Sequence, residues 1–115
     1  MQFTESLRKN EDFLKVYKNG RSHGNRYLVM YVLENGTGQN RLGISVSKKV
    51  GNSVVRHRVK RLVKESYRLH ESLFNSGLDL VVVARRSAAA VGYHEVLGAL
   101  LYLAGLHGIT NKEKG

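Results

Sequence analysis

The chain has 115 residues, which is enough for one domain with a modest hydrophobic core. It carries 19 Lys and Arg against 9 Asp and Glu, a formal net charge of +10 that favours nucleic acid or an anionic surface as partner. The absence of cysteine excludes disulfides and thiolate metal sites, and no apolar run is long enough for a membrane span or a secretory signal. We therefore expect one domain over residues 1–115, cytoplasmic and without a membrane partner, with a frayed tail at 110–115.

The first half of the chain predicts one helix and two strands. Asn10, followed by two acids, is typical of a helix N-cap, and Gly20 is a plausible end for that helix. Residues 27–33 have the composition of a strand, and the turn at 35–38 indicates a hairpin to a second strand at 41–47. In that second strand Leu, Ile and Val alternate with Gly and Ser, so one face suits a core and the other permits close approach of a sugar-phosphate chain.

The second half predicts a long helix, a buried strand and a final helix. The long helix starts near Asn52 and runs to about Phe74, and an apolar strand at 80–84 and an apolar helix at 92–106 follow. The strand–helix–strand passage suggests parallel neighbours in a mixed α+β sandwich. On the long helix, aliphatic residues expected to face the core fall within an arc of roughly 120°: Val55, Val59, Leu62, Val63, Leu69 and Leu73.

Basic residues gather on the opposite side of this helix. Residues 48–68 contain eight Lys or Arg and a single acid. Like charges at i, i+4 cost a helix roughly 0.2–0.5 kcal/mol per pair, and three such pairs follow one another at positions 56, 60, 64 and 68. A solvated face would interleave acids, so the pattern favours an anion-binding surface over a solubility face. Because base-reading Asn and Gln are scarce there, it favours recognition of a nucleic-acid backbone.

Other features leave two interpretations open. The turn at 50–53 either holds a phosphate at the helix N-terminus or simply caps the helix. Phe13, Tyr17 and Tyr31 form either a stacking platform for unpaired bases or part of the core. The five histidines lack metal-ligand spacing, and the scarce acids argue against hydrolytic chemistry by side chains, so we expect neither a catalytic residue nor a metal site.

The segment 41–62, RLGISVSKKVGNSVVRHRVKRL, resembles the signature of the bacterial ribonuclease P protein subunit, in which a Ser-Lys-Lys-x-Gly-Asn turn precedes an arginine-rich helix. Residues 10–20, 27–31 and 79–86 resemble its first helix, first long strand and last strand. The resemblance implies an α-β-β-β-α-β-α sandwich with a mixed four-stranded sheet and a left-handed βαβ crossover. It also implies a monomer in a 1:1 complex with ribonuclease P RNA. In that family the RNA removes the 5′ leader of precursor tRNA with magnesium that the RNA holds.

The resemblance also assigns site residues by position. Those expected to bind the RNA subunit are Lys48, Lys49, Asn52, Arg56, His57, Arg58, Lys60, Arg61, Lys64 and Arg68. Those expected to line the leader cleft are Phe13, Tyr17, Tyr31 and Arg86. The chain departs from the family pattern at His57, where Asn is usual, at Ser87, where Pro is frequent, and at Tyr17, where Phe is frequent. None of these departures removes a cation.

Two other classes of protein share some of these features. A ribosomal or general structural RNA-binding protein would carry the same basic helix without any processing role. A DNA-binding regulator would need base-reading residues on its recognition helix and a dimer surface, and the sequence shows neither.

Overall fold

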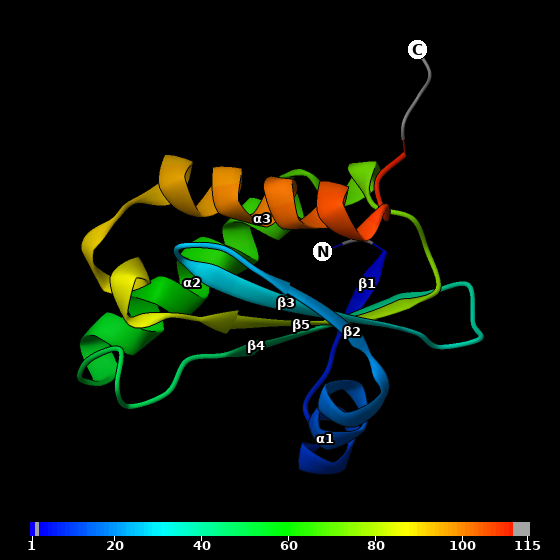
Figure 1. Cartoon of the computed structure of the whole chain (residues 1–115), viewed down its shortest axis with the longest axis horizontal. Helices are drawn as coiled ribbons and strands as arrows, with labels where there is room; N and C mark the ends of the chain where they lie inside the picture. The colour runs from blue at the N-terminus through cyan, green and yellow to red at the C-terminus, as the bar shows by residue number, and fades with distance from the viewer. Residues whose placement is uncertain (2, 112–115) are drawn as a thin grey trace.

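The computed structural model describes residues 1 and 3–111 and has three α-helices around one five-stranded sheet (Figure 1). The elements in chain order are β1 (Thr4–Ser6), α1 (Asn10–Asn19), β2 (Arg21–Gly24), β3 (Leu28–Glu34), β4 (Asn40–Ser45), α2 (Ser53–Leu69), η1 (Glu71–Leu73), β5 (Leu78–Ala84), η2 (Arg86–Ala90) and α3 (Tyr93–His107). The expected α-β-β-β-α-β-α order is present. The short strand β1 precedes it, so the sheet has five strands instead of the expected four.

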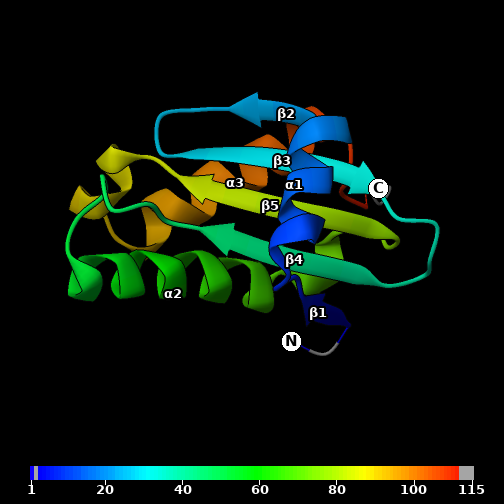
Figure 2. The same cartoon turned by 90° about the horizontal axis from the view of Figure 1, so that it is seen from below.

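The sheet is mixed, with the strand order β1-β4-β5-β3-β2. β4 pairs in parallel with β5 and with β1, whereas β3 is antiparallel to both β5 and β2. The passage β4–α2–β5 is a crossover between parallel neighbours. In Figure 2 both strands point left, β5 lies above β4, and α2 packs on the far side with α3, so the crossover has the expected left hand.

The predicted hairpin between β3 and β4 is wrong. The turn at 35–38 does join the two strands, but β5 lies between them and pairs with both. The reason is burial. β5 is apolar on both faces, and such a strand is most stable at the centre of a sheet with a helix layer on each side.

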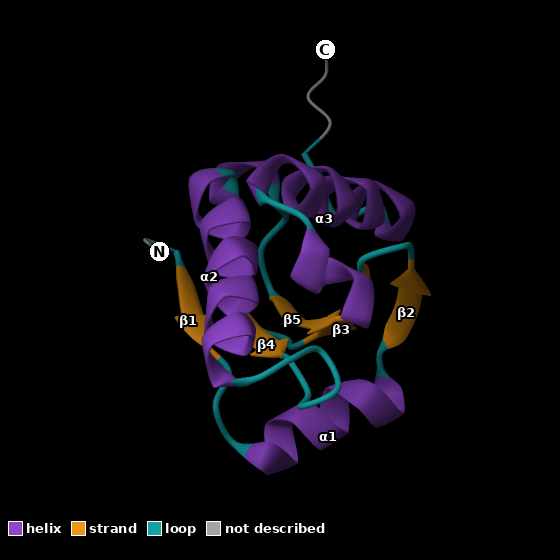
Figure 3. Ribbon diagram, turned by 90° about the vertical axis from the view of Figure 1, so that its left-hand side faces the viewer, coloured by secondary structure: helices purple, strands orange, loops and turns teal. Residues whose placement is uncertain are grey.

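Helices lie on both faces of the sheet (Figure 3), and each face has its own hydrophobic core. Leu80 and Val82 of β5 belong to the large core under α2 and α3. Val81 belongs to a smaller core under α1, where Val16 is fully buried, and Val83 packs against it. The alternation expected in β3 and β4 from the sequence follows the same division.

The helix α2 is shorter than predicted. It ends at Leu69, and the chain turns at His70 into the 3₁₀ turn η1. Leu69 is 55% exposed and Leu73 is 41% exposed, so neither belongs to the core as expected. Tyr67, two residues before Leu69, is fully buried in the core instead.

The ends of the chain also differ from expectation. Asn10 is the first helical residue of α1, and the N-cap is Lys9, without a side-chain cap bond. Thr110 pairs with Phe74, and the Asn111 amide donates to the Leu73 carbonyl at 2.7 Å, so these two residues are not frayed. The rest of the predicted tail, 112–115, lies outside the described residues.

Candidate RNA interface

The turn before α2 is closed by its own polar groups. The Asn52 side chain accepts a hydrogen bond from the Val55 amide at 3.0 Å and so caps the helix. The Ser47 carbonyl accepts from the Val50 amide at 3.1 Å. The capping interpretation of this turn is therefore confirmed, and Asn52 remains exposed at the start of the basic helix.

One side of α2 anchors it and the other carries exposed cations. Val59 and Val63 are fully buried. His57, Lys60, Arg61 and Lys64 are exposed and together line a shallow groove. Together with Lys48 and Lys49 of the preceding turn, we call Lys60, Arg61 and Lys64 the cationic face. Across the described part of the chain, none of its five members forms an ion pair with a carboxylate.

The other predicted cations of this region are engaged within the protein. Arg58 donates to the carbonyls of Ala89 at 3.4 Å and Val91 at 2.7 Å, and so ties α2 to η2. The Arg56 Nε donates to the Gly51 carbonyl at 3.1 Å. Arg68 forms an ion pair with Glu65, with Arg68 Nη2 2.7 Å from Glu65 Oε1, and the hydrogen bond from Arg68 lowers the pKa of Glu65. The predicted basic ridge therefore divides into exposed cations without carboxylate partners in the described structure and cations that are bonded within the protein.

A second surface lies where α1 crosses the sheet. Phe13, Tyr17 and Tyr31 are half-buried, so the structure combines the two interpretations: each ring packs on the small core and keeps an exposed side. Tyr17 meets Tyr31 edge to face with centroids 4.9 Å apart, and Phe13 lies 6.3 Å from Tyr17. The Phe13 ring rests on Gly43, where a Cβ would come 2.6 Å from the ring. A glycine here lets the ring lie on the strand.

Beyond α1 the same face of the sheet is uncovered (Figure 2). Its floor continues from Tyr31 through Val29 and Val83, flanked by Ser45 on β4 and Gly24 on β2, which the strand register places side by side. These side chains are small. We call this surface, with the three aromatic residues at its α1 end, the cleft.

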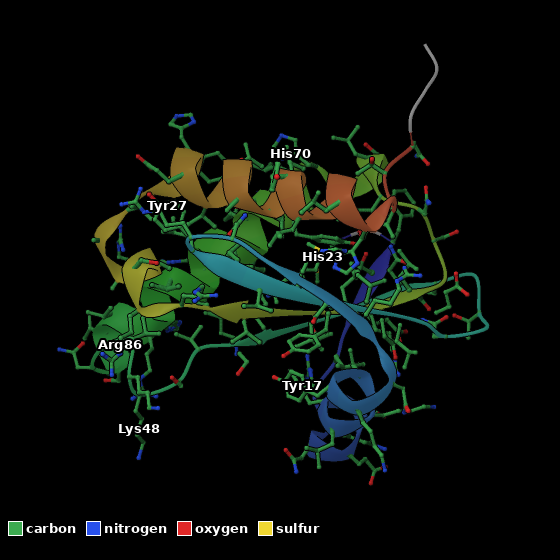
Figure 4. All side chains as sticks on the ribbon, in the orientation of Figure 1. Tyr17, His23, Tyr27, Lys48, His70 and Arg86 are labelled. Atoms are coloured by element: carbon green, nitrogen blue, oxygen red, sulfur yellow. The ribbon has the colours of Figure 1, made fainter. Side chains whose placement is uncertain are left out.

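The structure brings Arg85 over the cleft floor. Arg85 continues the alternation of Val81 and Val83, because its backbone is extended and its amide donates to the Tyr27 carbonyl at 2.8 Å. One guanidinium nitrogen of Arg85 lies 3.6 Å from where a Cβ on Gly24 would be. Figure 4 shows Arg86 at the end of the molecule where Lys48 also lies, away from Tyr17. Counting alternate residues from Val81 would have found Arg85 in the sequence.

An ion-pair network holds α1 against the sheet. Arg41 of β4 donates from Nε to Asp79 Oδ1 at 2.9 Å and contacts Asp79 Oδ2 at 2.6 Å and Asp12 of α1 at 3.4 Å. Burial raises the pKa of Asp79, but hydrogen bonds from Arg41 and Asn35 outweigh it and hold that pKa below its usual value. This network, which no local sequence pattern indicates, holds α1 against the sheet beside the cleft.

The described residues hold no group of three or more His, Cys, Asp or Glu side chains that could bind a metal ion. The rings of His23 and His107 lie 4.6 Å apart, but His107 Nε2 already contacts the Met30 carbonyl at 2.9 Å. Of the described helices, none has the length and apolar character needed to cross a bilayer.

A single sheet with a free cationic helix face on one side and a half-exposed aromatic cleft on the other defines a small basic RNA-binding protein. Comparison with known proteins gives the particular family. The family model described as Ribonuclease P matches residues 1–105. The chain belongs to the ribonuclease P protein family, and its function is that of a protein component of ribonuclease P, in tRNA processing.

Relatives and solved structures agree over almost the whole chain. The chain is 57% identical over 111 residues to the ribonuclease P protein component of Lachnoclostridium phytofermentans, covering 96% of both chains. It is 48% identical over 113 residues to that of Clostridium novyi, covering 96% of this chain and 100% of the relative. The Staphylococcus aureus RNase P protein structure superposes with a TM-score of 0.85 at 36% identity, covering 92% of this chain and 97% of that one. The RNase P protein structure from Thermotoga maritima superposes with a TM-score of 0.80 at 33% identity, covering 96% of this chain and 99% of that one. These comparisons do not support the alternative of a ribosomal or general RNA-binding protein.

Proposed function

We propose that the protein binds the RNA subunit of ribonuclease P through the cationic face and the 5′ leader of precursor tRNA through the cleft. The observation that carries the proposal is the set of exposed cations on one side of α2 and its preceding turn, without carboxylate partners in the described structure. Lys60, Arg61 and Lys64 are held on a helix that is anchored by fully buried valines. When fixed cations of this kind neutralise phosphates, counterions condensed on the RNA are released, and this release favours binding.

The cleft supports the second part of the proposal. A single-stranded leader is narrow enough to lie on a floor of Gly, Ser and Val, and its bases have faces that stack on exposed aromatic rings. Phe13, Tyr17 and Tyr31 present such rings at the α1 end, and Arg85 supplies a cation toward the other end. Mature tRNA has no leader, so the cleft distinguishes substrate from product.

We assign the cleavage chemistry to the RNA subunit. The buried and half-buried carboxylates of Asp79 and Asp12 are engaged by Arg41, and Glu65 is engaged by Arg68, so these groups serve structure. Magnesium would be held by phosphates of the RNA, and neutralisation of neighbouring phosphates by the protein would lower the magnesium that the RNA needs. One copy of the protein per RNA, in the cytoplasm, completes the proposal.

Reconstitution tests this function directly. The protein is mixed with a ribonuclease P RNA and labelled precursor tRNA, and cleavage is followed as magnesium is lowered. We expect the protein to restore cleavage at magnesium concentrations where the RNA alone is inactive. Absence of any such rescue, with protein shown by circular dichroism to be folded, would contradict the proposal.

A further inference from the structure

A groove lies between the two proposed RNA surfaces, at the edge of the sheet. β1 pairs with residues 40–42 of β4, so beyond Leu42 the edge of β4 that faces away from β5 has no strand partner among the described residues. Between this part of β4, the start of α1 and the side of α2 is a concave surface. Its lining includes three cations, Arg8, Lys60 and Lys64, around the apolar side chains of Leu7, Phe13 and Ile44.

The walls of the groove are fixed by bonds that hold β1 in place. The Thr4 hydroxyl lies 2.7 Å from the buried Tyr67 hydroxyl of α2, and the Leu7 amide donates to the Leu42 carbonyl at 2.9 Å. Tyr67 lies one turn beyond Lys64 on the same helix. The contact between Thr4 and Tyr67 therefore sets β1 beside the turns of α2 that carry the two lysines. A preformed groove binds a ligand without a large cost of ordering.

The composition of the groove indicates a ligand with two kinds of surface. Lys60 and Lys64 are one helical turn apart and repel each other, and Arg8 lies across from them. None of the three pairs with a carboxylate in the described structure, so a bound anion would relieve this repulsion. The floor, in contrast, is an aromatic ring and aliphatic side chains. A phosphate alone would leave that floor in water, and an uncharged apolar group would leave the cations unpaired.

We propose that the groove holds one unpaired nucleotide of RNA. Its phosphate is bound by Arg8, Lys60 and Lys64, and its base lies against Phe13 and Ile44. This inference rests on the proposed function and extends it, because Phe13 also borders the cleft and the two lysines also belong to the cationic face. The nucleotide comes from either the RNA subunit or the leader, since both can present an unstacked base here.

Nucleotide binding to the full-length protein alone tests the groove. Methyl resonances of Leu7 and Ile44 are followed by NMR during titration with adenosine monophosphate or inorganic phosphate at equal ionic strength. We expect adenosine monophosphate to shift both methyl groups and inorganic phosphate to leave them in place. Arg8→Gln should weaken this binding about threefold or more, since it removes one charged contact to phosphate. Arg21→Gln, an equal loss of charge on the opposite edge of the sheet, should have no effect.

Equal shifts with both ligands, or equal binding by the Arg8 and Arg21 variants, would overturn the inference. The same two variants in the holoenzyme then distinguish the sources. If the RNA subunit supplies the nucleotide, Arg8→Gln weakens binding of that RNA. If the leader supplies it, Arg8→Gln weakens only precursor tRNA with a leader. If Arg8→Gln weakens binding in neither assay, the inference is wrong. Lys49→Gln lies outside the groove, so it reports separately whether the proposed cationic face binds the RNA subunit.

Discussion

The cationic face and the cleft lie on different parts of one small molecule and use different physical interactions. The cationic face consists of exposed Lys and Arg side chains on α2 and its preceding turn, and the opposite side of α2 is buried. The cleft consists of rings and small side chains with Arg85 toward one end, and the charges that hold α1 beside it are paired in the network around Arg41. Under the proposed function, affinity and discrimination come from separate surfaces, because phosphate contacts are alike on every RNA whereas a leader is present only on precursor tRNA.

The largest effect is expected when the cationic face is neutralised. In the triple variant Lys60→Gln, Arg61→Gln, Lys64→Gln, three contacts to phosphate are lost at about 1 kcal/mol each, so affinity for the RNA subunit should fall about 100-fold. Filter binding at a fixed salt concentration measures this affinity. The matched control is Lys9→Gln, Lys18→Gln, Arg21→Gln, which removes the same charge from exposed positions elsewhere. An equal loss in both triple variants would mean that only net charge matters.

The next effect concerns the network that holds α1 over the cleft. Arg41→Met should lower the free energy of unfolding at neutral pH by about 2 kcal/mol, because Asp79 keeps its burial and loses its main partner. The pKa of Asp79 is depressed in the folded protein, so its stabilisation is present above the unfolded pKa and lost as pH falls through the folded pKa. The difference between wild type and variant should therefore narrow in acid. Urea unfolding across pH measures this, and a difference that stays constant with pH would contradict it.

A smaller and selective effect is expected in the cleft. Tyr17→Ala should weaken binding of precursor tRNA to the holoenzyme about tenfold, the scale of one lost base–aromatic stack, and leave mature tRNA unchanged. Tyr17→Phe keeps the ring and should bind both as wild type does. If Tyr17→Ala weakens the binding of precursor and mature tRNA equally, the leader does not bind in the cleft.

The smallest effect separates free cations from paired ones on α2. Arg68→Gln should change affinity for the RNA subunit less than about twofold, because its charge is already shared with Glu65. Arg61→Gln should cost about fivefold, as one contact to phosphate is lost. Side-by-side titrations of the two variants test the distinction, and a greater loss for Arg68→Gln would reverse it.

Local sequence patterns predicted much of the fold because they depend on neighbouring residues. The spacing of Val59 and Val63 against Lys60 and Lys64 is enough to orient α2, and the apolar run of β5 is enough to bury it. The same patterns failed where contacts between residues distant in the sequence decide which element forms. β1 is a three-residue strand without alternation that exists because it pairs with β4 and because Thr4 meets Tyr67.

The candidate site shows the same division. The sequence predicted which cations share a helix face and that the three aromatic residues belong together. It did not predict that Arg58 is bonded to η2 and Arg68 to Glu65, since these partners depend on side-chain geometry and on where η2 lies. The sequence named Arg86 for the cleft and not its neighbour Arg85, because the end of β5 was not fixed closely enough to decide which side chain continues the alternation.

The salt dependence of binding to the RNA subunit is the sharpest test of whether the cationic face contacts phosphates. Association constants are measured across a series of monovalent salt concentrations for the wild type and for the variant with Lys60, Arg61 and Lys64 replaced by Gln. If these side chains contact phosphates, the slope of log affinity against log salt should become shallower by about two to three units. A variant that is folded and binds with the wild-type slope would contradict the claim that this face of α2 binds the RNA backbone.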